Sequence, residues 1–187
     1  MNMRTLRGLL IEMKACNGSI DWVGDKTIER AVEHCYRGDW MIWIAKTIGV
    51  DDRKLTLAKG LCAQTFMFMM REDQSKKAIQ AAIDYGNGLI GDKELLLASH
   101  DAKHVLDTCE AIADDNPSFD KLVEYGLACC AYVTADKLAS AGNASLRFGI
   151  VSGYTPIEAQ KQLEMAEICR QVLSDEIIST ANKMLAS

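Results

Sequence analysis

Hydrophobic residues recur at steps of three and four along most of this chain, with polar residues between them. The pattern is clearest at six positions: Leu95, Ala98, Ala102, Val105, Cys109 and Ile112. Such spacing places an apolar stripe along one side of a helix and is typical of helical bundles. No segment shows the strict alternation of a half-buried strand. We therefore expect an all-α fold.

Glycine, aspartate and asparagine punctuate the pattern and predict the helix ends. Helices are expected over about 4–14, 27–37, 40–48, 52–70, 75–85, 93–113, 119–140 and 156–186. Asp51 or Asp52 should begin the fourth of these. The other expected N-caps are Asp25, Asp39, Asp92 and Thr155. Together they indicate one domain over residues 1–187, a bundle of about seven to nine helices.

The segment Phe66–Met70 is apolar at every position. A helix that is hydrophobic all round is usually surrounded by other helices. We expect this segment to lie, still helical, at the centre of the bundle.

The composition of the chain limits where the protein can be located in the cell and which kinds of molecule it can bind. The net charge of −5 disfavours binding to nucleic-acid phosphates, which needs a surplus of Lys and Arg. No apolar run approaches the roughly 20 residues that span a bilayer, and no signal peptide is apparent. The chain has 7 cysteines, which is an odd number, and no CxxC pair. This pattern is typical of a protein whose thiols stay reduced. We expect a cytoplasmic protein that binds neither membrane nor nucleic acid.

The run Gly86-Asn87-Gly88-Leu89-Ile90-Gly91 matches the G-x-G-x-x-G pattern of dinucleotide-binding folds. That pattern requires a preceding strand, whereas residues 75–85 have helical spacing. We interpret the run as a turn between two helices and expect no bound cofactor.

His100, His104 and Asp107 are the candidates for a metal site, since they follow one another at about one-turn spacing on a predicted helix. They lie opposite its apolar stripe, and the Glu of H-E-x-x-H is missing. A solvated helix face is the simpler interpretation. Cys35 adjoins His34, but neighbouring helical residues do not face each other. We expect neither a metal site nor a catalytic residue, and no enzyme.

All 3 tryptophans fall between residues 22 and 43: Trp22, Trp40 and Trp43. Large aromatic residues are common both in cores and as interface anchors. The spacing of Trp40 and Trp43 favours packing in the core, while a partner surface stays the alternative.

Two stretches carry a resemblance to a known family: Trp22-Val23-Gly24-Asp25, and the run from Cys35 through Gly38-Asp39-Trp40 to Trp43. They resemble segments of helical bacterial and phage immunity proteins of polymorphic-toxin systems. The likeness continues through Gly49–Arg53 and, weakly, to Glu164–Arg170. The middle of this chain is richer in Leu, Cys and charged residues than is typical of that family.

The resemblance implies a protein that neutralises a cognate protein toxin by binding it, without catalysis. Trp22, Asp25, Cys35, Gly38, Asp39, Trp40 and Trp43 are then the family-motif or partner-binding residues. One alternative is a helical scaffold or oligomerising protein of phage or mobile-element origin, and another is a metal-dependent enzyme that uses His100, His104 and Asp107.

We expect an acidic surface to bind the partner, because the helical seams use most large apolar residues and leave no room for a deep pocket. Neither the toxin nor a homo-oligomeric state follows from the residues.

Overall fold

The computed structural model describes residues 5–116, 118–139 and 158–186, which are all-α with no strand among them. Their helices are α1 (Leu6–Glu12), α2 (Asn17–Val23), α3 (Ile28–His34), α4 (Gly38–Ile48), α5 (Asp52–Gln64), η1 (Met67–Met69, a 3-10 turn), α6 (Asp73–Gly86), α7 (Asp92–Asp115), α8 (Phe119–Ala135) and α10 (Glu158–Ala186). The all-helical prediction is confirmed. None of these helices combines the length and apolar character needed to cross a membrane.

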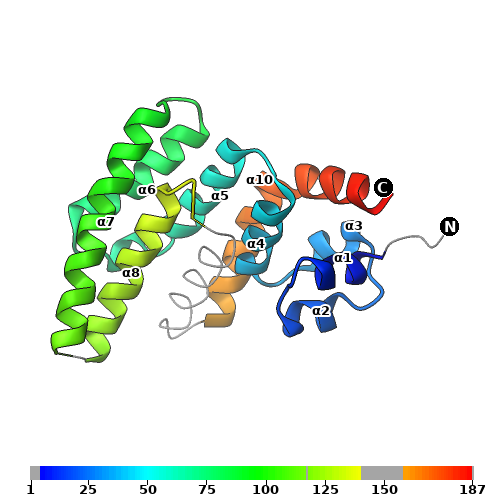
Figure 1. The fold of residues 1–187 in the computed structure, drawn as a ribbon, viewed down its shortest axis with the longest axis horizontal. Coiled ribbons are helices and arrows are strands. Elements are labelled where there is room, and N and C mark those ends of the chain that lie inside the picture. The colour runs from blue at the N-terminus through cyan, green and yellow to red at the C-terminus, as the bar shows by residue number, and fades with distance from the viewer. Residues whose placement is uncertain (1–4, 117, 140–157, 187) are drawn as a thin grey trace.

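The helices form two ends joined by a common middle (Figure 1). At one end α7 and α8 make a hairpin that packs on α6, and α6 packs on α5. At the other end lie the short helices α1, α2 and α3. Between them are α4 and α10, and the 29-residue α10 contacts α3, α4 and α5. Helix α10 therefore holds the two ends together.

One hydrophobic core passes through this middle region. It contains Leu10 from α1, Ile42 from α4, Cys62 from α5 and Leu173 from α10. Phe66 belongs to the same core and is fully buried. The central position predicted for Phe66 is confirmed.

Met70 is buried in this core as well, but the helix end and Phe68 differ from the prediction. Helix α5 ends at Gln64, where the N–H groups of Thr65 and Phe66 bond to carbonyls three residues back instead of four. This tightening leads into η1 and turns the chain towards α6. Phe68 is 79% exposed as a result, so the expectation of a helix buried on every face is wrong.

Three of the predicted N-caps are wrong. Helix α3 is capped by Thr27, whose hydroxyl accepts from the Arg30 N–H, and not by Asp25. Asp39 lies inside the first turn of α4, and Asp92 is the first residue of α7. The Asp51 cap is confirmed, since its carboxylate accepts from two N–H groups of the first turn. Thr155 lies outside the described residues.

The glycine-rich run is a turn between helices, as predicted. Helix α6 ends at Gly86 and α7 begins at Asp92. Gly88 has φ +76°, in the left-handed region that glycine adopts without steric strain.

The hairpin seam is well buried at one end and open at the other. Leu95 and Val105 of α7 and Cys129 of α8 are buried, as their spacing predicts. Further along, Ile112 is 43% exposed and Phe119 is 66% exposed. The seam therefore opens towards the loop that joins α7 to α8.

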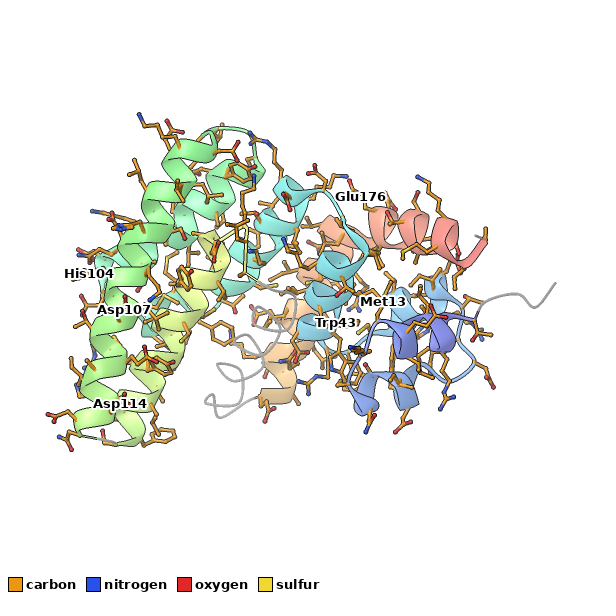
Figure 2. The ribbon with its side chains drawn as sticks, in the orientation of Figure 1. Met13, Trp43, His104, Asp107, Asp114 and Glu176 are labelled. Atoms are coloured by element: carbon orange, nitrogen blue, oxygen red, sulfur yellow. The ribbon has the colours of Figure 1, made fainter. Side chains whose placement is uncertain are left out.

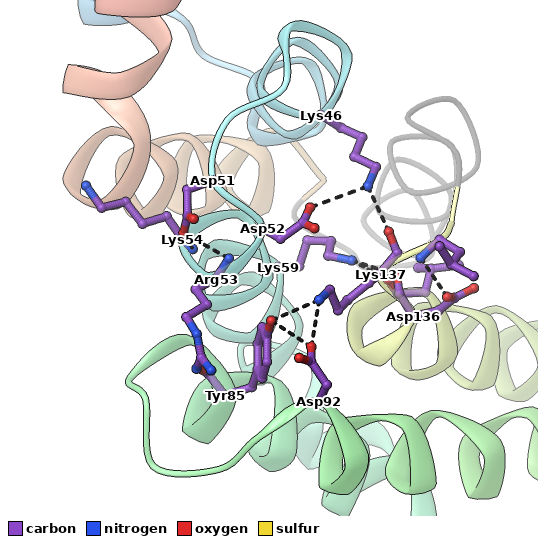
Figure 3. Close-up of polar contacts among 12 residues, drawn as sticks. Lys46, Asp51, Asp52, Arg53, Lys54, Lys59, Tyr85, Asp92, Asp136 and Lys137 are labelled. Atoms are coloured by element: carbon purple, nitrogen blue, oxygen red, sulfur yellow. Dashed lines mark hydrogen bonds and ion pairs between the residues drawn. The ribbon is translucent and has the colours of Figure 1, made fainter.

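A polar junction fixes the end of α8 to the helices around it (Figure 3). We use this name for Lys46, Lys59, Tyr85, Asp92 and Lys137. The Lys137 ammonium donates to the Tyr85 hydroxyl (3.0 Å) and to the Asp92 carboxylate (2.7 Å), which raises its pKa. The buried Lys59 ammonium donates to the carbonyls of Val133 (2.8 Å) and Asp136 (3.1 Å). Burial lowers the pKa of Lys59 to about 8.

Candidate functional site

Most of the family-motif residues meet at one cavity. Trp22, Cys35, Asp39, Trp40 and Trp43 all line a space of about 560 Å³ between α4 and the short helices α1 to α3. The expectation that the packed seams leave no room for a pocket is therefore wrong. The physical reason is that the short helices α1 to α3, although their apolar residues are buried, make few close backbone contacts with α4 and so leave a space beside it.

The walls of the cavity are largely apolar. The aliphatic lining residues come from α1, α3 and α4 and from the end of α2: Leu6, Leu10, Val23, Ile28, Ala31, Val32, Met41 and Ile44. Leu6 and Leu10 of α1, and Ile28, Ala31 and Val32 of α3, recur at three- and four-residue steps, so in each helix they share one face. The hollow between them depends on how the helices pack, which the spacing does not encode.

Aromatic rings form one wall. The rings of Trp22 and Tyr36, and those of Trp22 and Trp40, are 5.9 Å apart between centroids, and Tyr36 and Trp40 are 5.5 Å apart. These separations and tilted geometries are typical of favourable aromatic contacts. The Lys26 ammonium lies 4.8 Å from the Trp22 ring centroid, and the Arg37 guanidinium lies 5.2 Å from that of Trp40. The three tryptophans therefore lie neither wholly within the core nor wholly on the outer surface of the protein.

A bidentate ion pair borders the cavity. Arg37 donates from Nε to Asp39 Oδ1 at 3.0 Å and from its NH2 nitrogen to Oδ2 at 2.6 Å. Asp39 is only 5% exposed, and its carboxylate also accepts from the Trp40 N–H. These hydrogen bonds raise the pKa of Arg37. The pair fixes the start of α4, which explains an acidic residue in a buried first turn.

Gly38 has a packing role behind the cavity. A Cβ at this position would lie 2.3 Å from the Met165 Cβ and 2.9 Å from the Ala166 nitrogen. Only glycine lets α4 and α10 cross so closely. Arg170 of α10 also donates to the Cys35 carbonyl at 2.6 Å, so the Cys35–Gly38 motif is anchored to α10.

Asp25 stands apart from the other motif residues. It is exposed in the turn between α2 and α3 and does not line the cavity. Its neighbour Gly24, at φ +51°, makes the left-handed turn that ends α2. The structure thus brings five of the seven motif residues to the cavity.

Cys35, which lines the cavity, and Cys62, which lies in the core, are not activated nucleophiles. Burial raises the pKa of the Cys35 thiol to about 11, and burial likewise raises that of Cys62 well above its ordinary value. The Sγ atoms of Cys62 and Cys169 lie 3.8 Å apart in the core. A thiol with a raised pKa stays protonated and is a weak nucleophile at neutral pH.

The metal candidates lie on the outer side of α7, where Figure 2 labels His104 and Asp107. His100 and His104 are exposed, and Asp107 pairs with Lys103. Among the described residues, no group of three His, Cys, Asp or Glu side chains is close enough to hold a metal ion.

A second surface of note is the acidic hairpin end, which we define as Ile112, Asp114, Asp115, Phe119, Asp120 and Leu122. Figure 2 shows Asp114 at this end, remote from Trp43 and the cavity. Asp114, Asp115 and Asp120 are exposed and form no ion pair with another described residue. The predicted helix boundary at 113–119 located this turn, but Ile112, which is exposed here, was expected in the apolar stripe.

Comparison of the chain with protein-family models, curated proteins and solved structures finds no match.

Proposed function

We propose that this chain is an immunity protein that neutralises a basic protein toxin by binding it, and that the acidic hairpin end is the binding surface. The observation that carries the proposal is the combination of unpaired acids and exposed apolar side chains at that end. The resemblance of the Trp22–Trp43 segment to immunity proteins gives the biological setting.

Charge supports a basic partner. Between Asp107 and Glu124 the sequence has six acidic residues and one lysine, and the ion-pair partners Lys103 and Arg71 reduce the net charge of the group to −3. A concentrated field of one sign steers an oppositely charged partner and speeds association.

Exposed apolar groups lie within this field. Ile112 is 43% exposed, Phe119 66% and Leu122 42%. Interfaces commonly combine an apolar centre with a charged rim. Association of two copies through this surface is disfavoured, because their acidic residues would oppose each other. The scaffold alternative is therefore less well supported here than a basic partner.

Helix electrostatics indicate that two of these acids, Asp114 and Asp115, do not serve stability. Asp114 and Asp115 occupy the last turn of α7, which has no basic residue. The C-terminus of a helix carries partial negative charge, so acidic residues there are unfavourable. Residues kept at a position that lowers stability are good candidates for binding.

The test is co-expression with the products of neighbouring genes. A toxic product should lose its toxicity when this chain is present and should be retained by it at about 0.05 M salt more strongly than at about 0.5 M. The double variant Asp114→Lys with Asp115→Lys should lose protection. The matched control is Asp101→Lys with Asp175→Lys, which changes the same charge at exposed sites outside the hairpin end.

Loss of protection in the hairpin variant but not in the control supports the proposal. If no neighbouring product is toxic, or if a toxic product is neither bound nor neutralised, the immunity function is wrong. Equal protection by both double variants would contradict the assigned surface.

A further inference from the structure

We propose that the cavity between α4 and the short helices binds a small amphipathic molecule with an apolar body and an anionic head. This site is separate from the acidic hairpin end, and the inference does not rest on the immunity function. It rests on the size of the cavity, its walls and the charges that line it.

Size and walls fit a small organic ligand. The volume of about 560 Å³ lies within the roughly 300 to 1,000 Å³ of pockets that hold such molecules. Those pockets are lined mainly by aliphatic and aromatic side chains with a few polar groups, as this one is. The Arg37–Asp39 pair satisfies its own charges and so leaves the inner walls effectively apolar.

Charge at the cavity selects an anionic head. Its lining contains Lys14, Arg37 and Asp39, which is two cations and one anion. Lys14 is exposed and forms no ion pair with another described residue. The cavity therefore carries a net positive charge in a chain whose total is −5. The ammonium of Lys14 is the group available to a carboxylate.

The backbone at Lys14 supports a role for its side chain. Lys14 has φ +59°, and the N–H groups of Lys14 and Ala15 bond to the carbonyls of Ile11 and Leu10, both at 3.0 Å. This is the left-handed turn after a helix that glycine usually fills. Within the described residues, Lys14 is the one non-glycine position with positive φ. A lysine here gives up local stability and adds a cationic residue to the lining of the cavity.

The three tryptophans of the chain make binding directly measurable. Trp22, Trp40 and Trp43 all line the cavity, so an occupant changes the whole tryptophan fluorescence signal. We would titrate the full chain with decanoate, decanol and decyltrimethylammonium, each below its micelle concentration. These probes share an apolar body and differ in the charge of the head.

Decanoate should bind saturably with one molecule per chain. Decanol should bind about threefold to fivefold more weakly, as suits one exposed ion pair, and the cationic probe should bind weakest. Ala31→Phe, which fills the cavity from α3, should weaken all three by at least about tenfold. Lys14→Gly should remove the preference for decanoate over decanol while raising the midpoint of thermal unfolding. Lys77→Ala, at an exposed lysine of α6, is the control.

Absence of saturable binding by the unmodified chain would overturn the proposal, as would equal affinity for the three heads. Binding unchanged in both Ala31→Phe and Lys14→Gly would place the probes elsewhere and also overturn it. If Ala31→Phe does not fold, the Lys14→Gly comparison decides the result alone. None of these outcomes depends on whether a toxin exists.

Discussion

The two ends of this molecule differ in shape and charge. The cavity end is concave, aromatic and locally positive, whereas the hairpin end projects outward and carries unpaired acids around exposed apolar side chains. They share one feature. Lys14 stands where glycine is favoured, and Asp114 and Asp115 stand at a helix end that disfavours acids. Residues placed against local stability are one reason for proposing both ends as binding surfaces.

The common core between the ends should give the largest mutational effect. Phe66→Ala removes a fully buried ring and should lower the free energy of unfolding by about 3 to 5 kcal/mol. Phe68→Ala, two residues away and 79% exposed, should change it by less than about 0.5 kcal/mol. Chemical denaturation of both variants measures the difference. Equal effects would mean that the chain does not turn at Gln64 as described.

The contrast between Phe66 and Phe68 also shows how far the sequence predicts the structure. Apolar spacing identified the helices other than α2 (Asn17–Val23), which was not expected, and it identified the central position of Phe66, because burial of an apolar stripe is a local property of the pattern. It did not predict that α5 stops at Gln64. That end depends on where the chain must turn to reach α6, which is a tertiary requirement.

Three of the helix caps and the cavity were missed for the same reason. Asp39 looks like a cap in sequence, but its pairing with Arg37 and the close crossing at Gly38 move the helix start back to Gly38. The tryptophans were named from the sequence, but the hollow beside them comes from the loose packing of α1 to α3. The spacing of apolar residues within one helix does not determine how that helix packs against its neighbours.

The polar junction, which joins the hairpin to the middle, should make stability depend on pH through Lys59. Its pKa is about 8 in the folded protein and near 10.5 in an unfolded chain. Below pH 8 both states hold the proton and the folded state bears the full penalty of a buried charge. Between pH 8 and 10.5 the unfolded state binds more protons, so stability due to Lys59 rises with pH.

Lys59→Met isolates this contribution from the other titrating groups. The unfolding free energy of the unmodified chain relative to the variant should increase by about 1 kcal/mol from pH 7 to pH 9. Denaturant unfolding at both pH values measures it. A difference that is constant with pH would show that Lys59 keeps its ordinary pKa.

Substitutions at the hairpin end should change the free energy of unfolding less. They should raise it, whereas most mutations lower it. Asp114→Asn with Asp115→Asn removes two acids from the C-terminus of α7 and should raise the unfolding free energy by about 0.3 to 1 kcal/mol. The gain should shrink at high salt. Destabilisation of the double variant would show that these acids have a structural role.

The most direct test of the proposed function is the association rate constant between this chain and its toxin, measured by stopped-flow mixing across ionic strength. The unmodified chain should associate fast at low salt and about tenfold or more slowly near 0.5 M. Asp114→Lys with Asp115→Lys should associate slowly at low salt with little further dependence on salt. If both proteins show the same rate and the same salt dependence, the hairpin end is not the surface that binds the toxin.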